Sequence, residues 1–452
     1  MSLPASLSTR RRFLQGAATV LSAPFVLPSG SFSKPLNSML QVANIGVDGM
    51  GFGDLKNIGS HPKVKLVAFC DIDSDRFKKA DQAFPNVPHH SDYMEMLEKL
   101  GDTVDAVSVT IPDHSHARAA INAMRRGKHV YCQKPLAHTV WECRQMRLWA
   151  AKTGVITQMG NQIHSNIEYR LAVRLIQDGA IGKIKEVHSW VDVDGRERTH
   201  RVDRPGKDEE KPAPANVNWD LWIGPAPMRP FVPDTYHPFV WRDWQDFGSG
   251  ALGDFGCHIL DPIFTALELH APLSLVAENA GTNHEVWPGP QKIHYTFPGN
   301  ARTAGQTLPV TWYDGRQRPD KALAQMPPDL DLPKGGSLLI GEAGNMVLPH
   351  VAGPRLYPLE KFSQYPYPHD VKGALHWHVW VDHVFANEKT SDGFHYAGPL
   401  AETVQLGNIA ARLPGQTLSW DAEAFHLSGH PDAEGMLTTA YRSGFEVPAA
   451  PV

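Results

Sequence analysis

The sequence predicts an α/β protein whose first half folds around a mostly parallel sheet. From residue 40 to residue 160, short apolar runs alternate with longer stretches of helical character, an order typical of β-α-β units. A glycine-rich turn follows the first apolar run, and an aspartate ends the second one. Together these observations predict a strand, turn, helix and strand arrangement that binds a dinucleotide.

The first predicted strand, residues 40–45, leads into the turn 46–51 and then into a helix at about residues 52–60. Glycines in such a turn let the backbone approach a pyrophosphate, and the helix N-terminus offers free N–H groups. The middle position of the motif holds Asp48, whose carboxylate would repel phosphate, while Gly49 supplies the tight turn. A fold that has lost its cofactor is therefore the alternative. The candidate cofactor residues of this turn are Gly46, Asp48, Gly49, Met50 and Gly51.

The second predicted strand, residues 64–71, ends at Asp71, which lies 20 residues after Gly51. An acid at this place holds the ribose hydroxyls of the cofactor. It favours NAD, because the 2′-phosphate of NADP would meet a negative charge. Arg76 follows closely enough to leave NADP possible.

Further strands are predicted at residues 106–110, 129–132 and 155–160, with helices at about 117–126 and at 140–153. Ligands of parallel sheets bind at the carboxyl ends of the strands, so the residues that follow these strands should converge on one crevice. The candidate cofactor residues among them are Thr110, Pro112, His114, His116, Lys134, Asn161 and Gln162.

Six segments carry a more specific pattern. They are residues 45–51, 70–73, 110–116, 133–135, 160–162 and 252–261. Together they resemble the Gfo/Idh/MocA oxidoreductase family, although residues 133–135 read Gln-Lys-Pro where that family has Glu-Lys-Pro. The resemblance implies a Rossmann domain followed by an α/β domain with a large open, predominantly antiparallel sheet. That sheet would shield the nicotinamide and form the interface of a homo-dimer or homo-tetramer.

The segment 252–261 holds the candidate catalytic pair. Asp254 and His258 are four residues apart, so a helix would place them on one face, where the carboxylate could orient the imidazole. By resemblance, Lys134 donates a hydrogen bond to the reacting oxygen, His258 is the base, and Asp254 is its partner or a substrate ligand. The alternative is a helix-capping aspartate and a core histidine.

Two aromatic segments, residues 218–225 and 236–244, suit the binding of a sugar, because rings stack on its C–H faces and polar side chains bond its hydroxyls. Packing of these rings under a long loop explains them equally well. The candidate substrate residues are His164, Tyr169, Tyr236, Trp241 and Arg242.

The chain divides into four predicted parts. Residues 1–38 are a signal and linker, 39–160 the Rossmann domain, 161–415 the substrate and oligomerisation domain, and 416–452 a segment that packs back on the fold. Within the third part, the charged and proline-rich residues 195–216 show no periodicity and should form an excursion outside the core. Helices are expected there at about 167–178, 374–387 and 398–413.

The first residues suggest export. The stretch 9–15 contains three consecutive arginines followed by Phe-Leu, and residues 16–27 carry no charge. This resembles a twin-arginine signal, which predicts a periplasmic or other extracytoplasmic location. A basic tail before a short helix is the alternative. No clear cleavage site follows, so the signal could be cut imprecisely or retained as an anchor.

The composition limits the classes of function. With 452 residues and a formal net charge of -5, the chain has no basic surplus for nucleic acid. No apolar run long enough to cross a membrane appears beyond a possible uncleaved signal. The four cysteines show no metal spacing; two disulfides are possible, and buried free thiols are favoured. The 23 histidines form no zinc motif, so we expect no metal.

The leading hypothesis is an exported NAD(P)-dependent oxidoreductase that acts on a hydroxyl of a sugar, glycoside or cyclitol. Since no obvious nicotinamide pool exists outside the cytoplasm, its cofactor should be tightly bound and recycled internally. Sugar oxidoreduction and glycoside cleavage by oxidation and elimination both satisfy this constraint. The alternatives are a catalytically inactive sugar-binding or scaffold protein on a dehydrogenase fold, which Asp48 supports, and a metal-dependent hydrolase.

Overall fold

Two β-sheets of different character organise residues 39–451, the part of the chain that this computed structural model describes. The first sheet has six strands, all parallel, in the order β3-β2-β1-β4-β5-β6, which is the strand order of a Rossmann fold. The second has nine strands. The predicted α/β fold class is confirmed. The predicted export signal lies outside the described residues.

Helices cover both faces of the first sheet, which explains why its strands are apolar runs without alternation. Its strands are β1 (Leu40–Ile45), β2 (Val64–Cys70), β3 (His89–His90), β4 (Ala106–Val109), β5 (His129–Gln133) and β6 (Thr157–Gly160). Its helices are α1 (Met50–Gly59), α2 (Phe77–Ala83), α3 (Tyr93–Leu100), α4 (Asp113–Arg125) and α5 (Val140–Thr153). Helix α5 has the predicted bounds because both ends are signalled: a capping box of Thr139 and Glu142 starts it, and Gly154 at φ 68° ends it.

Helix α4 begins at Asp113, four residues before the predicted start. Pro112 stands directly before the helix, a position where the missing N–H of a proline costs nothing. The early start places His114 and His116 inside the helix instead of in the loop. Both side chains are buried there.

The second sheet is antiparallel except where β7 pairs with β10. Its order is β13-β12-β11-β7-β10-β9-β8-β14-β15. Its strands are β7 (Ile184–Val191), β8 (Ser274–Asn279), β9 (Gln291–Pro298), β10 (Thr307–Tyr313), β11 (Gly335–Gly341), β12 (Asn345–Pro349), β13 (Arg355–Tyr357), β14 (Leu418–Asp421) and β15 (His426–Ser428). The expectation of a large, predominantly antiparallel sheet is confirmed.

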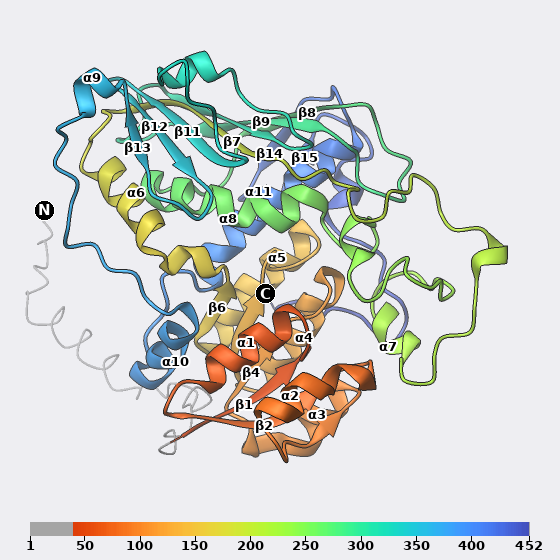
Figure 1. Cartoon of the computed structure of the whole chain (residues 1–452). Helices are drawn as coiled ribbons and strands as arrows, with labels where there is room; N and C mark the ends of the chain where they lie inside the picture. The colour runs from red at the N-terminus through yellow and green to blue at the C-terminus, as the bar shows by residue number, and fades with distance from the viewer. Residues whose placement is uncertain (1–38, 452) are drawn as a thin grey trace, which may run out of the picture. The chain divides into compact units, whose positions relative to one another are not determined.

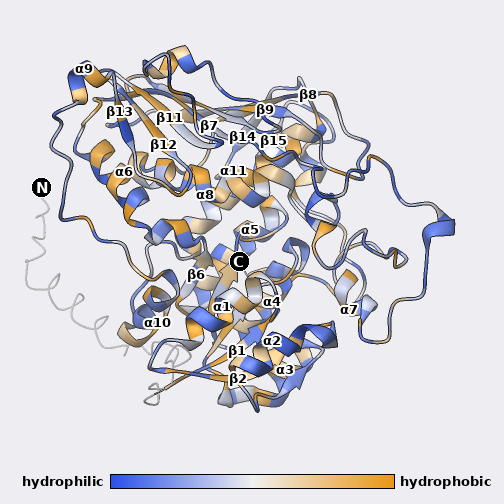
Figure 2. Cartoon of the chain, in the orientation of Figure 1, coloured by the Kyte–Doolittle hydropathy of each residue, from blue (hydrophilic) through white to orange (hydrophobic). Residues whose placement is uncertain are grey.

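Three helices lie between the two sheets: α6 (Ile167–Gln177), α8 (Gly250–Leu267) and α11 (Phe394–Arg412) (Figure 1). Hydrophobic residues mark these helices and the strands that face them (Figure 2). One core cluster runs from Val107 of β4 through Met146 of α5 and Val404 of α11 to Tyr295 of β9. The two sheets therefore share one core, which holds the catalytic candidates on α8 in a defined place relative to the first sheet.

The predicted start of helix α11 at residue 398 was wrong, because the helix begins at Phe394 and continues through Pro399. Proline breaks helices through its lost N–H bond, but early in a helix it forfeits only one such bond. The remaining short helices are α7 (Trp219–Ile223), α9 (Leu359–Phe362) and α10 (His376–Ala386).

The end of the chain returns to the first sheet. The indole Nε1 of Trp149 on α5 donates to the carbonyl oxygen of Pro448 at 3.0 Å. Arg118 on α4 donates to the carbonyl oxygen of Gly444 at 3.0 Å. The last described residues thus lie across helices α4 and α5.

All four cysteines, Cys70, Cys132, Cys143 and Cys257, are buried and free, which confirms the preference for free thiols. Among residues 39–451, no helix combines the length and apolar character needed to cross a membrane. The same part of the chain holds no group of three histidine, cysteine or acidic side chains placed to bind a metal ion.

Gly407 offers a test of how closely α11 packs. A Cβ atom there would lie 2.0 Å from the Tyr295 hydroxyl and 2.7 Å from Cδ2 of Leu252. Alanine normally stabilises a helix relative to glycine, but here we expect Gly407→Ala to lower the free energy of unfolding by about 1–3 kcal/mol through overpacking. Gly53→Ala in α1 is the matched control, since its Cβ meets only Met50 Sδ at 3.9 Å, and it should be neutral or stabilising. Urea unfolding of both variants measures this; an unchanged Gly407→Ala protein would contradict the packing.

Candidate active site

The glycine-rich turn has the shape that a pyrophosphate requires. Gly46 has φ 83°, and a Cβ atom there would lie 2.0 Å from the carbonyl oxygen of Thr110, so the turn can press against β4 only without a side chain. Gly49 precedes helix α1 with φ 56° and faces open space. No side chain caps this helix, so the N–H groups of its first turn remain available to an anion.

Asp48 does not oppose a phosphate, because two cations neutralise it. Its carboxylate accepts from Arg76 Nη1 at 3.1 Å and from Lys79 Nζ at 2.9 Å. Burial alone would raise the pKa of Asp48, but the bonds from Lys79 and Arg76 outweigh it and lower the pKa. The Asp48 carboxylate was the main reason to consider that the fold had lost its cofactor. Its bonds to Arg76 and Lys79 remove that reason.

Asp71 ends strand β2 beside the turn. Its two carboxylate oxygens accept from the backbone N–H groups of Val47 at 3.2 Å and Asp73 at 3.1 Å, which fixes the carboxyl group at the ribose end of such a site. Burial raises its pKa to about 6. Arg76 is engaged by Asp48 and by Asp73, the latter at 2.9 Å, so it is not free to receive the 2′-phosphate of NADP. The residues present fit NAD.

The strand ends after β4 and β5 are tied together by the buried Asp54 of α1. Its carboxylate accepts from Thr110 Oγ1 at 2.8 Å, from Gln133 Nε2 at 2.9 Å and from Trp377 Nε1 of α10 at 2.7 Å. A glutamate at position 133 would bring a second carboxylate against Asp54, whereas the amide donates to it. The departure from Glu-Lys-Pro therefore has a local electrostatic reason.

His114 and His116 do not offer ring nitrogens to a cofactor. His114 contacts the carbonyl oxygens of Phe247 at 3.2 Å and Trp222 at 3.1 Å. His116 contacts those of Pro135 at 2.9 Å and Ile111 at 2.7 Å. Because α4 starts early, these rings anchor the helix to neighbouring loops, and the geometry does not support their prediction as cofactor ligands.

Lys134 and Asp254 meet where the first sheet faces helix α8. Lys134 Nζ donates to Asp254 Oδ1 at 2.5 Å and to the backbone oxygen of Asp254 at 2.8 Å. Arg198 donates to the other carboxylate oxygen of Asp254, and Arg242 Nε lies 3.9 Å from Oδ1. Burial would raise the pKa of Asp254, but the charges of Lys134, Arg198 and Arg242 lower it below its usual value.

His258 lies one helical turn beyond Asp254 and contacts a different partner. Its Nδ1 bonds to Oδ1 of Asn161, while Nδ2 of Asn161 donates to the carbonyl oxygen of Cys257 at 3.0 Å. The second bond assigns the amide orientation, so Asn161 presents an acceptor and Nδ1 must carry the proton. Nε2 then keeps a lone pair, and no group among residues 39–451 bonds to it.

The expected carboxylate–histidine pair is not formed. The Asp254 carboxylate turns to Lys134 and Arg198, and an amide, not an acid, orients His258. Burial, together with the positive charge of Lys134, holds the pKa of His258 well below its ordinary value. His258 is therefore a neutral imidazole at physiological pH.

The remaining predicted residues at the end of β6 fall into two groups. Gln162 lies beside the cofactor turn, with Nε2 3.8 Å from Met50 Sδ. His164 lies deeper: its Nδ1 is 2.9 Å from Asp261 Oδ1, and its Nε2 is 2.8 Å from Ser391 Oγ. Burial would lower the pKa of His164, but Asp261 outweighs it and raises the pKa to about 9. Although this order matches an acyl-transfer triad, an imidazolium cannot act as the base.

The predicted substrate residues are only partly brought together. Tyr169 bonds through its hydroxyl to His350 Nδ1 at 3.0 Å, and the His350 ring centroid is 5.9 Å from that of His258. Arg242 lies at the Asp254 cluster. Tyr236 and Trp241, in contrast, are 2% and 6% exposed in an aromatic core cluster, so their prediction as substrate contacts was wrong and the packing alternative holds.

Two site residues escaped the sequence analysis. Arg198 comes from the segment 195–216, whose lack of periodicity gave no sign that one side chain returns to α8. Asp113 begins helix α4, and burial raises its pKa to about 7 although the charges of Arg242 and Lys134 oppose this. In the motif Asp-His-Ser-His, the histidines were predicted as site residues and the aspartate was not. The aspartate, Asp113, is the group that lies near the catalytic candidates.

Comparisons with known proteins identify the family of the chain. Residues 40–161 match an oxidoreductase family described by its NAD-binding Rossmann fold, and residues 195–303 match the C-terminal alpha/beta domain of that family. Among curated proteins, a glycosyl hydrolase family 109 protein of Shewanella sp. (strain ANA-3) is 30% identical over 159 residues, covering 33% of this chain and 34% of that protein. An alpha-N-acetylgalactosaminidase of Shewanella oneidensis is 28% identical over 203 residues, covering 39% and 44%. The matches thus span less than half the length of these relatives.

Solved structures share the fold along most of the chain. A WlbA dehydrogenase from Bordetella pertussis, in complex with NADH and UDP-GlcNAcA, gives a TM-score of 0.60 at 15% identity and covers 85% of this chain and 99% of that one. An aldose-aldose oxidoreductase from Caulobacter crescentus gives a TM-score of 0.55 at 16% identity and covers 84% and 100%.

The tautomer of His258 can be read by ¹⁵N NMR of its ring. We expect Nδ1 protonated and Nε2 unprotonated from about pH 8 to about pH 5.5, because the pKa lies well below the ordinary value. The variant Asn161→Asp places a carboxylate on Nδ1 and should raise the pKa of His258, so that the ring becomes doubly protonated within this range. Spectra of His258→Gln identify the signals. A wild-type His258 that titrates near its ordinary value would contradict the assignment.

His164 makes stability depend on pH. Its pKa in the folded protein, about 9, exceeds that of an unfolded histidine. Its contribution is therefore complete below about pH 6.5 and is lost as pH rises through about 9. We expect the unfolding free energy of the wild type to exceed that of His164→Gln at low pH, with a gap that shrinks by up to about 3 kcal/mol between these values. A gap that is constant, or that grows with pH in urea titrations, would refute this.

Proposed function

Because the chain belongs to the Gfo/Idh/MocA family of oxidoreductases, with an NAD-binding Rossmann domain, we propose that it oxidises a hydroxyl group of a sugar or glycoside. The single observation that carries this proposal is that a charged donor and a neutral acceptor lie in one site, close enough for the charge of the donor to lower the pKa of the acceptor. The ammonium of Lys134 is held by Asp254, and one helical turn away His258 keeps an unprotonated Nε2.

The chemistry follows from these two groups. Oxidation of an alcohol removes a hydride from carbon and a proton from oxygen; NAD, when bound, supplies the hydride acceptor. Lys134 donates a hydrogen bond to the reacting oxygen and stabilises negative charge as it develops there. Nε2 of His258 accepts the hydroxyl proton, and this needs no prior deprotonation because the imidazole is already neutral.

The other residues hold these groups in place. Asp254 restrains Lys134 through two hydrogen bonds, and Arg198, which also pairs with Asp243, holds the other oxygen of the Asp254 carboxylate. Asn161 fixes the tautomer of His258, so it is a positioning residue. Arg242, at the edge of the cluster, is a donor for a neighbouring hydroxyl of the substrate.

We further propose that the enzyme is exported and keeps its NAD between turnovers, with no net change in the redox state of the substrate. The twin-arginine pattern at residues 9–15 supports export. Relatives named as glycosyl hydrolases support a redox-neutral cycle that cleaves a glycoside, and a solved aldose-aldose oxidoreductase supports sugar oxidoreduction as the other form of such a cycle. A homo-dimer or homo-tetramer remains part of this proposal.

The inactive sugar-binding alternative loses its main support. It rested on the carboxylate of Asp48 in the phosphate turn, and this carboxylate is bound by Arg76 and Lys79. An inactive scaffold also gives no reason for a desolvated lysine–aspartate pair beside a neutral histidine.

The first test is the nucleotide content of the purified protein. We expect about one NAD for each chain, released on denaturation and identified by mass spectrometry. Turnover is then assayed with 4-nitrophenyl N-acetyl-α-galactosaminide and with free aldoses, while nicotinamide absorbance is followed. Protein that neither carries nucleotide nor binds added NAD would refute the proposal.

The variant Lys134→Met keeps the length of the side chain and removes its charge. We expect at least a ~10²-fold loss of turnover, because stabilisation of the reacting oxygen is lost, with the NAD content retained. Lys152→Met, on the exposed end of α5, is the matched control and should leave turnover unchanged. Full activity of Lys134→Met would exclude the assigned role and favour another donor.

A further inference from the structure

A polar cavity lies apart from the catalytic candidates. Its volume is about 180 Å³, far more than the roughly 10–15 Å³ that one water needs. It is bounded by the start of helix α5, the end of helix α11, residues 225–227 and 245–246, and the returning segment 436–441. Lys134, Asp254 and His258 do not line it. We name it the Arg412 cavity after the residue that ends α11.

Arg412 is unusual because no acid in the described part of the chain forms an ion pair with it. Its Nε is buried without a hydrogen bond, and no acceptor or carboxylate among residues 39–451 bonds to its guanidinium. Its guanidinium lies over the ring of Trp287, whose centroid is 4.9 Å from Cζ, and the charge of Asp246 acts on it without a direct bond. Burial lowers its pKa only to about 10, so the group is charged at neutral pH. A guanidinium withdrawn from solvent without a hydrogen-bonded acceptor is costly, which points to an acceptor supplied from outside the chain.

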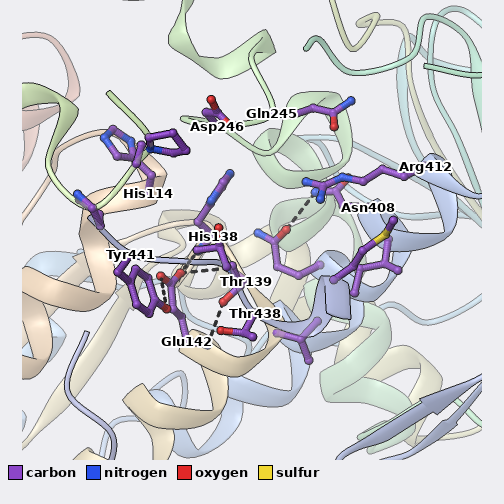
Figure 3. Close-up of a pocket in the computed structure, with 18 of the residues that line it drawn as sticks. His114, His138, Thr139, Glu142, Gln245, Asp246, Asn408, Arg412, Thr438 and Tyr441 are labelled. Atoms are coloured by element: carbon purple, nitrogen blue, oxygen red, sulfur yellow. Dashed lines mark hydrogen bonds between the residues drawn. The ribbon is translucent and has the colours of Figure 1, made fainter. Parts of the chain in front are cut away.

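The acids of the cavity are already satisfied. Asp246 accepts from Arg229 Nη2 at 2.5 Å and Nε at 2.7 Å. Glu142 caps helix α5, accepts from the Tyr441 hydroxyl at 3.0 Å, and has its pKa raised to about 7 by burial. Figure 3 shows Arg412 reaching in from one side, with Asn408 beside it and with His138, Glu142 and Tyr441 across the cavity.

The histidines add no charge. Burial lowers the pKa of His114 to about 4 and that of His138 to about 3, so both rings are neutral. The lining therefore holds one guanidinium without a hydrogen-bonded acceptor, surrounded by hydroxyl and amide groups. The polar neighbours of this kind are Thr139, Gln245, Gln405, Asn408, Thr438 and Thr439.

We propose that the Arg412 cavity binds a small polyhydroxylated monocarboxylate, such as a sugar acid. The planar guanidinium matches a carboxylate in a bidentate arrangement, and the hydroxyl and amide groups around it match the hydroxyls of the ligand. A phosphate dianion fits less well, because it would need a second cation and would lie near Asp246 and Glu142. This site does not include the catalytic candidates, so ligand binding there does not depend on the proposed catalytic function.

Binding is tested on the full-length protein by isothermal titration calorimetry and thermal unfolding with galacturonate, gluconate, galactose, phosphate and sulfate. We expect both carboxylates to bind and to raise the unfolding temperature, with galactose, phosphate and sulfate at least tenfold weaker. Arg412→Gln should lose the carboxylate effect by at least tenfold. Arg355→Gln, an exposed arginine on β13, makes the same chemical change elsewhere and should retain it.

Two further outcomes decide the location and the ligand class. Lys134→Met should bind the carboxylates as the wild type does; loss in this variant would place the ligand in the catalytic site and overturn the proposal. Equal binding of sulfate or phosphate would overturn the assignment to a carboxylate. Absence of binding by the wild type, or unchanged binding by Arg412→Gln, would overturn the site itself.

Discussion

The carboxylate of Asp254 is the interaction on which the candidate site depends. It lies on helix α8, which packs against the second sheet, and it binds two cations. These are Lys134, at the end of β5, and Arg198, from segment 195–216. Arg198 also pairs with Asp243 at 3.0 Å, so two acids balance the two cations, as the unfavourable burial of unpaired charge requires. Burial and the positive charge of Lys134 hold the pKa of His258 low, and the Asp254 carboxylate, bonded to the two cations, forms no hydrogen bond with the ring.

A similar balance governs the cofactor turn. Asp48 is compatible with a phosphate site because Arg76 and Lys79 neutralise its negative charge. Position 133 carries an amide because the buried Asp54 already accepts from Thr110 and Trp377 and needs a donor, not a second acid. Both departures from the family pattern are thus local consequences of where carboxylates lie. Neither implies that nucleotide binding was lost.

Much of the fold was predictable because its signals are local. Buried strands can be recognised as apolar runs. The two ends of α5 are predicted by its capping residues, Thr139 and Glu142 at the start and Gly154 at the end. The glycine turn and the residues Lys134, Asp254 and His258 also carry recognisable spacing. What failed depends on distant partners: α4 begins early and takes His114 and His116 into the protein, while Tyr236 and Trp241 complete a core. Arg198 reaches Asp254 because segment 195–216 passes close to helix α8. The sequence of this segment has no hydrophobic periodicity from which that path could be predicted.

Two histidines of the same region show how the partner decides the chemistry. His164 bonds to the carboxylate of Asp261, and its pKa rises to about 9; it is a cation that stabilises the fold and cannot accept a proton. His258 bonds to the amide oxygen of Asn161, which adds no negative charge, and burial lowers its pKa. An aspartate at 161 would orient the ring equally well, but it would keep the proton on the base. The amide of Asn161 therefore orients the ring of His258 without adding a negative charge beside it. Asp254 is then left to bind Lys134, and His258 stays unprotonated and can act as a base.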